Sequence, residues 1–237
     1  MAKQDLRERI WDLLEAEGIA RFPFPPHDRI PNFAGAEAAA ALLGETDEWQ
    51  AAEAIKANPD APQLPVRRRA LREGKTVYMA VPRLRDENPF YELDPATIPP
   101  DEYDSAPTIS HVESYARQVP PEEVATIDLV VSGSVAVTAT GARVGKGEGY
   151  SDLEYAVLRE LGLVAGETPI ATTVHDSQVV DEDVAVEAHD VPMDLVVTPT
   201  ETIRTATEHQ KPSGVFWDEL SDERIAAIPS LDVRRPE

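Results

Sequence analysis

The stretch "IDLVVSGSVAVTATGARVGKGEGYSDLEYAVL" (127–158) decides the fold class of this chain. It begins with two apolar runs, at 127–131 and 134–138, which are typical of buried strands. Four glycines then fall within residues 141–149, and a helical pattern follows over about 151–161. Strands that lead into a glycine-rich turn and a helix predict an α/β fold with a largely parallel sheet.

The rest of the chain alternates between helical and strand-like patterns. Helices are expected over residues 3–18, 35–55 and 66–74. Strands are expected within residues 75–82, 168–174, 184–190 and 193–205. The proline-rich residues 21–33 and 86–107 are predicted to be irregular.

The composition excludes several classes of protein. The 237 residues include no cysteine, which excludes disulfides, thiolate metal sites and a cysteine nucleophile. No stretch approaches the roughly 18 apolar residues of a membrane span, and the charged N-terminus lacks an apolar signal core. A net charge of −22 repels nucleic acid. We therefore expect a cytoplasmic protein that binds neither nucleic acid nor membranes.

The acidic residues are spread along the chain, and lysine is scarce. There are 44 acidic residues, and only five of the 22 basic residues are lysines. This pattern is typical of an acidic surface adapted to concentrated salt, where screening removes the self-repulsion. The alternative is an ordinary acidic enzyme. In either case each remaining lysine is a candidate for a specific role.

The glycine-rich segment predicts a phosphate-binding site. Such a turn lets backbone N–H groups converge at the N-terminus of the following helix, where the potential is positive. The spacing matches neither the dinucleotide fingerprint nor the P-loop motif. However, the segment carries Arg143 and Lys146, and Asp152 lies where a carboxylate could hold Mg²⁺ beside bound phosphates. The alternative is a glycine-rich hairpin in which Asp152 is a plain helix N-cap.

The segment "GARVGKGEGYSD" (141–152) resembles the signature of the 5-formyltetrahydrofolate cyclo-ligase family, which runs G-x-R-x-G-x-G-x-G-Y-Y-D. Ser151 stands in place of the second tyrosine. Two further motifs of the family, a basic one on the first helix and an acidic one before a late strand, agree with this chain at Lys3, Leu6, Arg7, Gln178 and Asp190.

The resemblance implies a fold, an activity and two cofactors. The fold would be a three-layer α/β/α sandwich with a central, mostly parallel sheet over residues 1–205. Residues 206–237 would be a C-terminal extension that packs on this domain or is partly irregular. The family's activity is the ATP- and Mg²⁺-dependent closure of 5-formyltetrahydrofolate to 5,10-methenyltetrahydrofolate. The expected partners are therefore ATP and a reduced folate, in a monomer or small homo-oligomer.

The resemblance also implies roles for particular residues. ATP would contact Lys3, Arg7, Arg143, Val144, Gly145, Lys146, Gly147, Glu148, Gly149, Tyr150 and Ser151. The folate would contact Lys146, Gly147, Glu148, Gly149 and Tyr150. Arg143, Lys146 and Tyr150 would be catalytic, and Asp152 and Asp190 would hold Mg²⁺. In the alternative interpretation, Lys3 and Arg7 form a solvated helix face and Asp190 belongs to a turn before a strand.

The first half of the chain departs from the ordinary cyclo-ligases. Segments such as "NPDAPQLPVRRR" (58–69) resemble a distinct branch of the family, the methenyltetrahydrofolate synthetase domain-containing proteins. The glutamate that the ordinary members place near the pterin has no identifiable counterpart. Arg67, Arg68 and Arg69 predict either an anion-binding pocket or a helix face that is paired to the acidic surface.

Two alternative functions follow from this departure. One is a paralogous nucleotide-dependent enzyme with another acceptor, such as one in thiamine metabolism. The other is a non-catalytic protein that binds a nucleotide or a folate. Retention of both Asp152 and Asp190 argues against the second alternative, because a binding protein has less need for two metal carboxylates.

Overall fold

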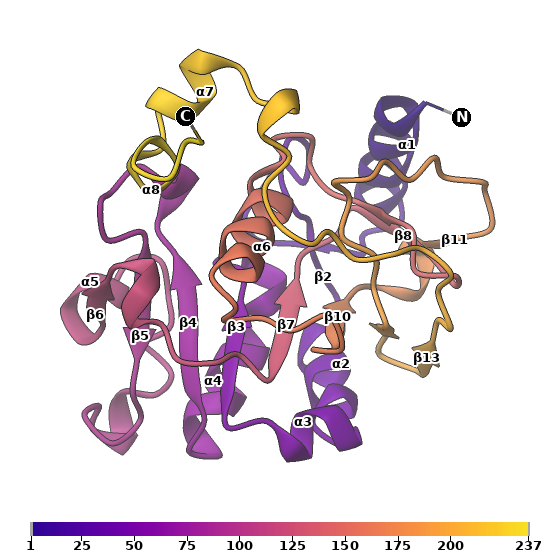
Figure 1. Cartoon of the computed structure of the whole chain (residues 1–237). Coiled ribbons are helices and arrows are strands. Elements are labelled where there is room, and N and C mark those ends of the chain that lie inside the picture. The colour runs from indigo at the N-terminus through magenta and orange to yellow at the C-terminus, as the bar shows by residue number, and fades with distance from the viewer. Residues whose placement is uncertain (1, 237) are drawn as a thin grey trace.

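A computed structural model describes residues 2–236 and shows a central eight-stranded sheet with helices on both faces (Figure 1). Across the sheet the strands are β13 (Thr202–Arg204), β12 (Leu195–Val197), β10 (Ile170–Thr173), β7 (Leu129–Ser132), β3 (Ala54–Ala57), β4 (Thr76–Ala80), β5 (Phe90–Leu93) and β6 (Arg117–Val119). The five strands from β12 to β4 pair in parallel. The three outer strands, β13, β5 and β6, join through antiparallel pairs. The predicted mostly parallel sheet is confirmed.

The helices cover the sheet in two layers. They are α1 (Lys3–Ala16), α2 (Ala36–Leu43), α3 (Asp47–Ala51), α4 (Leu64–Arg72), α5 (Val112–Tyr115), α6 (Tyr150–Glu160), α7 (Asp222–Ala226) and α8 (Pro229–Asp232). Leu43, Trp49 and Leu71, from α2 to α4, are buried in a core on one face of the sheet. Leu153 and Leu158 of α6 are buried in a separate core on the other face. Because both faces are covered, the central strands are buried throughout, as in other parallel sheets.

A second, three-stranded sheet supports α1. It consists of β11 (Val179–Val180), β8 (Ala136–Thr138) and β9 (Arg143–Val144). The chain passes into it at Gly133, where a Cβ atom would lie 2.9 Å from Ile30 and 3.0 Å from Oε1 of Gln63. The second apolar run, 134–138, therefore forms a strand as expected, but in a different sheet from the first run. A further antiparallel pair joins β1 (Ala20–Arg21) to β2 (Asn32–Phe33).

The helix expected over 35–55 is interrupted after Leu43, and it is wrong after Ala51. The segment contains α2 and the short α3, and the central strand β3 begins at Ala54. All four residues of β3 are buried between β4 and β7. A short apolar run of this kind reads equally well as helix or strand, and only its pairing partners decide between them. This correction matters because β3 leads directly into the functional site.

Two other sequence-based expectations are also wrong. Residues 86–107 were expected to be irregular, but they contain β5. The strand expected at 184–190 is absent, and a turn closes there with a hydrogen bond from the Asp190 amide to the Glu187 carbonyl, at 3.0 Å. Alternating Val and Ala side chains produced the strand pattern in that segment, although no neighbouring strand is available to pair with it.

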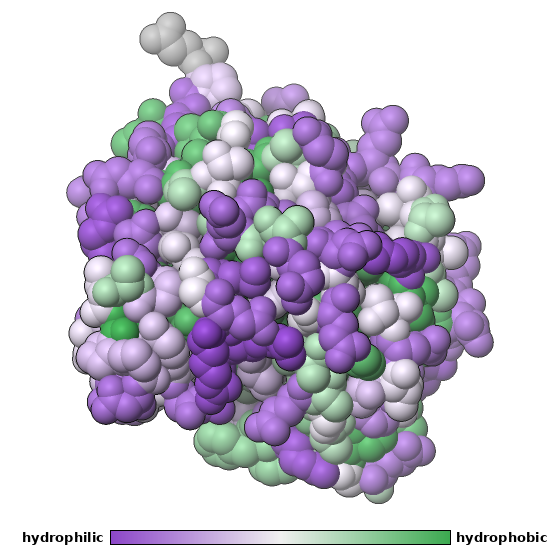
Figure 2. All heavy atoms as spheres, turned by 90° about the horizontal axis from the view of Figure 1, so that it is seen from below, coloured by the Kyte–Doolittle hydropathy of each residue, from purple (hydrophilic) through white to green (hydrophobic). Residues whose placement is uncertain are grey.

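The C-terminal residues continue the layer that contains α6. Ile225, Ile228 and Leu231 are buried in the same core as Leu153 and Leu158. No helix within residues 2–236 has the length and apolar character needed to cross a membrane. Figure 2 shows the face at the bottom of Figure 1, which is covered mainly by hydrophilic residues with small scattered hydrophobic patches.

Candidate active site

A cavity of about 490 Å³ opens at the carboxyl ends of the parallel strands. Its lining includes Asn58, Val81 and Gly133, the residues that directly follow β3, β4 and β7. Open α/β sheets bind ligands at this edge, because the loops that leave neighbouring strands diverge there. In Figure 1 the edge lies at the top of the sheet, on the side where α1 and α7 are found.

The glycine-rich loop, defined here as residues 145–149, forms one wall of the cavity. It connects β9 to the first turn of α6. Gly147 and Gly149 have φ values of 103° and 69°, in the left-handed region that side chains disfavour. Gly149 is also the N-cap residue of α6, so the hairpin alternative with Asp152 as N-cap is wrong. The glycines therefore shape a loop that leads into a helix N-terminus.

Four cations meet at the loop and form what we call the cationic end of the cavity: Lys3, Arg7, Arg143 and Lys146. Lys3 and Arg7 come from the first turns of α1, and Arg7 donates from Nε to the Gly145 carbonyl at 2.6 Å. Burial lowers the pKa of the Arg7 guanidinium and the charge of Arg143 lowers it further, while Asp190 raises it. These contacts with distant segments show that Lys3 and Arg7 are not merely a solvated helix face.

Asp152 and Asp190 lie in the same end of the cavity, and each is paired with one of these cations. Asp152 Oδ2 lies 2.7 Å from Arg143 Nη2, and its Oδ1 accepts the Val191 amide at 3.1 Å. Asp190 Oδ2 lies 2.5 Å from Lys3 Nζ. The two carboxylates are therefore neighbours, joined through the residue that follows Asp190.

The two carboxylates are a small donor set for a metal ion. Within residues 2–236 no group of three or more His, Cys, Asp or Glu side chains is arranged to hold a metal. Mg²⁺, however, commonly takes only one or two carboxylates and completes its shell with phosphate oxygens and water. Two adjacent carboxylates beside the glycine-rich loop fit that pattern.

The structure brings together almost all of the residues that the sequence selected. The cavity is lined by Lys3, Arg7, Arg143, Gly145, Lys146, Gly147, Glu148, Gly149, Tyr150, Ser151, Asp152 and Asp190. Val144 is the exception, because its side chain is buried in the second sheet, in the core beneath α1. Their contacts with ATP, Mg²⁺ or folate stay predictions.

A buried ion pair beneath the cavity was missed by sequence reasoning. Lys56 of β3 pairs with Glu154 of α6, and the two side chains are only 1% and 7% exposed. Lys56 Nζ also donates to Asn58 Oδ1 at 2.8 Å, and Asn58 Nδ2 donates to Ser151 Oγ at 3.2 Å. This network ties β3 to the first turns of α6, next to the glycine-rich loop. The available signal was a lysine inside an apolar run of a chain that has only five lysines.

The three consecutive arginines do not line the cavity. Arg67 is 1% exposed and donates to the carbonyls of Asn58, Pro59, Asp60 and Pro107. Burial lowers the pKa of its guanidinium, and the charge of Asp60 raises it in part. Arg68 and Arg69 pair with Asp104 and Glu73 on the surface. Arg67 is therefore a clamp for the turn after β3, and the anion-binding hypothesis is wrong for this cavity.

Another part of the cavity lining, which we call the apolar end, collects side chains from several strands and loops. Its apolar lining is Met79, Val81, Pro82, Tyr91, Ile109 and Val112, and its carboxylates are Asp60 and Glu113. Tyr91 donates from its hydroxyl to Glu113 Oε1 at 3.0 Å. Burial, followed by this hydrogen bond, raises the pKa of Tyr91 to about 12. The apolar end can therefore hold a flat, largely apolar group with polar edges.

One longer-range charge interaction and one ion pair connect the ends. Burial raises the pKa of the Asp60 carboxyl, and Lys146 of the loop is the charge that most opposes this rise. Arg83, which follows β4, lies 3.3 Å from Glu148 of the loop and has a left-handed φ of 59°. Such strained residues often lie at functional sites. The two ends therefore form one continuous site.

The model of the 5-formyltetrahydrofolate cyclo-ligase family matches residues 1–199. The chain therefore belongs to the 5-formyltetrahydrofolate cyclo-ligase family. It is similar over 236 residues to methenyltetrahydrofolate synthase domain-containing proteins, with 43% identity to that of Bos taurus and 41% to that of Homo sapiens. The predicted resemblance to this branch is confirmed.

These relatives are longer than the chain studied. Each match covers 98% of this chain and 61% of the relative, so the chain spans about three fifths of the length of the curated relatives it matches. Over 81 residues, which are 34% of this chain and 38% of the relative, the chain is 33% identical to a 5-formyltetrahydrofolate cyclo-ligase of Mycolicibacterium smegmatis.

A solved structure supports the fold. The chain is similar to the 5,10-methenyltetrahydrofolate synthetase of Aquifex aeolicus, with a TM-score of 0.54 and 20% identity. The match covers 87% of this chain and 94% of the solved chain. At this level of identity, the likeness confirms the α/β architecture alone.

Proposed function

We propose that this chain catalyses the ATP- and Mg²⁺-dependent closure of 5-formyltetrahydrofolate to 5,10-methenyltetrahydrofolate. The observation that carries the proposal is the division of one cavity into two ends. Four cations surround a glycine-rich loop at one end, and the other end is apolar with two carboxylates. Membership of the cyclo-ligase family supports this assignment of the ends. The first end suits a triphosphate, and the second suits a pterin-like acceptor.

The proposed reaction has two chemical steps. The formyl oxygen attacks the γ-phosphorus of ATP, and ADP leaves. N10 of the folate then attacks the activated carbon, inorganic phosphate leaves with the formyl oxygen, and the N10 proton passes to the departing phosphate. Neither step requires a covalent bond to the protein, so the chain's contribution is alignment and charge stabilisation.

The cations and the loop carry that contribution. Lys3, Arg7 and Lys146 would hold the phosphates, together with amide groups of the glycine-rich loop. Arg143 is held by the Gly133 carbonyl at 2.8 Å and by Asp152, so its orientation is fixed before a ligand binds. A group fixed in advance stabilises developing charge without reorganising during the reaction.

The two carboxylates would hold the metal. Asp152 and Asp190 would exchange part of their pairing with Arg143 and Lys3 for Mg²⁺ when a nucleotide binds. The bound ion would supply charge neutralisation between the phosphate oxygens. At the apolar end, Asp60 and Glu113 are the candidates for the carboxylate that recognises the amino and ring N–H groups of the acceptor.

One observation favours the paralogous enzyme as a second candidate. The apolar end presents two carboxylates rather than one, and one of them accepts a hydrogen bond from Tyr91. An acceptor with more donor groups, or with a positive charge, would also fit such an end.

A single assay tests the proposal. Purified chain is incubated with ATP, Mg²⁺ and 5-formyltetrahydrofolate in concentrated salt, and the ultraviolet absorbance of the methenyl product is followed. We expect product formation that depends on both ATP and Mg²⁺. Absence of product despite measurable ATP binding would favour the paralogous enzyme. Absence of both would contradict the phosphate-binding assignment.

A further inference from the structure

A second cavity, of about 370 Å³, lies beside the glycine-rich loop. Its lining joins the loop and α6 to a part of the C-terminal residues, Phe216–Arg224, which we call the C-terminal wall. These residues follow the end of the family match at residue 199. The segment that bounds one side of this cavity therefore lies outside the family match.

The C-terminal wall is attached directly to the loop. Arg224 donates from Nη2 to the Glu148 carbonyl at 2.7 Å, and its guanidinium carbon lies 4.1 Å from the centroid of the Tyr150 ring. Such cation–π contacts add to the hydrogen bond. Ile225 and Ile228, which follow it, are buried in the main core. The wall is thus anchored both to the core and to the phosphate-binding loop.

The chemical character of the second cavity differs from that of the first. Its apolar lining comes from Leu153, Ala156, Phe216 and Leu220. Its acidic lining comes from Glu148, Asp152 and Glu219, and its cation, Arg224, is already engaged with the loop. Each carboxylate already has a partner, Asp152 with Arg143, Glu148 with Lys146 and Glu219 with His189. The remaining lining is mainly apolar and suits a neutral, flat ring system.

The two cavities also share a border. Gly147, Glu148, Gly149, Asp152 and His189 line both of them. A nucleotide whose phosphates rest on the glycine-rich loop can therefore extend across it. The first cavity, at about 490 Å³, is of ordinary size for a single ligand. With phosphates at one end and an acceptor at the other, it leaves little room for a nucleoside.

We propose that the second cavity is the subsite for the base of the purine nucleotide. Phe216 and Leu220 would pack against the ring, and Ser221 and Glu219 at the rim would meet its polar edge. This inference rests on the proposed function, since it assumes that the loop binds the phosphates. It goes further by assigning nucleotide selectivity to the C-terminal wall.

The test compares two ligands that share a polyphosphate but differ in the nucleoside. The affinities of ATP and inorganic tripolyphosphate, each with Mg²⁺, are measured by calorimetry on the full chain. We expect Phe216→Ala and Leu220→Ala each to weaken ATP about tenfold, because each removes a large apolar contact. Tripolyphosphate affinity should change less than about twofold, since neither side chain would touch phosphate.

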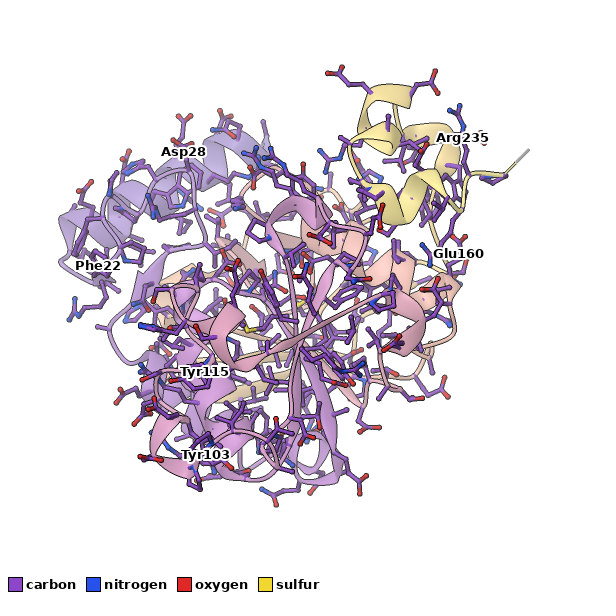
Figure 3. All side chains as sticks on the ribbon, turned by 90° about the vertical axis from the view of Figure 1, so that its left-hand side faces the viewer. Phe22, Asp28, Tyr103, Tyr115, Glu160 and Arg235 are labelled. Atoms are coloured by element: carbon purple, nitrogen blue, oxygen red, sulfur yellow. The ribbon has the colours of Figure 1, made fainter. Side chains whose placement is uncertain are left out.

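A matched control uses the same part of the chain. Arg235 lies near the C-terminus (Figure 3). It pairs with Asp222 on the surface. Arg235→Ala should leave both affinities unchanged. Should an alanine variant lower the melting temperature strongly, Leu220→Gln retains most of the side-chain volume while removing the apolar contact, and it should still weaken ATP selectively.

The possible outcomes separate this inference from the proposed function. Selective loss of ATP affinity supports the subsite. Unchanged ATP affinity, or equal weakening of both ligands, overturns it. Wild-type protein that binds tripolyphosphate as tightly as ATP would overturn the subsite and leave the phosphate-binding loop intact. Wild-type protein that binds neither ligand would overturn both proposals.

Discussion

The cationic end of the cavity comes mainly from one continuous segment, residues 143–152, whereas the apolar end collects residues that follow or belong to β3, β4, β5 and α5. At the cationic end Lys3, Arg7 and the 189–190 pair come from elsewhere in the chain. At the apolar end no segment supplies more than five consecutive lining residues. A site built locally is visible as a motif, and a site built from distant segments is not.

The two ends of the cavity also place different constraints on the sequence. Under the proposed function, the cationic end requires particular residue types at fixed spacing, because glycine φ angles and charges would have to match a triphosphate. The apolar end requires mainly shape and apolar area, which many combinations of residues satisfy. We therefore expect changes in the first end to remove activity and changes in the second to alter the acceptor.

The largest expected effect is at the buried pair of Lys56 and Glu154 beneath the cavity. Lys56→Met leaves the Glu154 carboxylate buried without its partner and should destabilise the chain by about 3–5 kcal/mol. Chemical denaturation measures this change. The double variant Lys56→Met with Glu154→Leu should recover most of the loss, because no buried charge then remains. Equal destabilisation of the single and double variants would show that the pair contributes by packing rather than by charge.

The next effect tests the cationic end. Asp152→Asn keeps the shape of the side chain and an acceptor for the Val191 amide but removes the charge. We expect ATP turnover with the acceptor to fall at least about a hundredfold, since Arg143 loses its partner and the metal loses a ligand. Steady-state kinetics measure the fall. A nearly unchanged rate with unaltered Mg²⁺ dependence would contradict the metal assignment.

A smaller effect tests the apolar end through its pH dependence. Burial raises the pKa of Asp60 above its ordinary value of 3.8, so the folded chain binds more protons than the unfolded chain just above that pH. The stability contribution of Asp60 therefore falls as the pH rises through the folded pKa. Asp60→Asn removes this loss and should raise the free energy of unfolding at neutral pH by about 1 kcal/mol.

The free energy of unfolding is measured for wild type and for Asp60→Asn, at acidic and at neutral pH. The difference should vanish near and below pH 3.8, where the carboxyl is protonated in both states. Acceptor affinity should weaken in the same variant while ATP affinity is retained. A variant that loses ATP affinity instead would place Asp60 with the cationic end.

The smallest expected effect is that of salt on stability, which acts through the charged surface rather than through either end of the site. A net charge of −22 creates self-repulsion that salt screens. We expect the melting temperature to rise with KCl by roughly 2–4 °C for each 1 kcal/mol of repulsion removed. Maximal stability in dilute neutral buffer would contradict the salt-adaptation hypothesis.

Sequence reasoning succeeded where the relevant signal lies within a few consecutive residues. The loop glycines, Arg143, Lys146 and Asp152 could be selected because strand, loop and helix follow one another in one stretch. It failed at β3, where an alanine-rich segment carries a helical pattern until it pairs with β4 and β7. It also failed at Arg67, whose clamp on the turn after β3 depends on carbonyl groups that only the fold brings together.

By itself, the sequence determined the α/β class, the family, the acidic character of the chain and the cationic end of the site. These features depend on local spacing and on composition, which do not require knowledge of the fold. The tertiary structure decided the course of β3, the buried pair of Lys56 and Glu154, the apolar end and the attachment of the C-terminal wall to the loop. Each of these is a contact between residues far apart in the chain. Its energy comes from burial and pairing that exist only after folding.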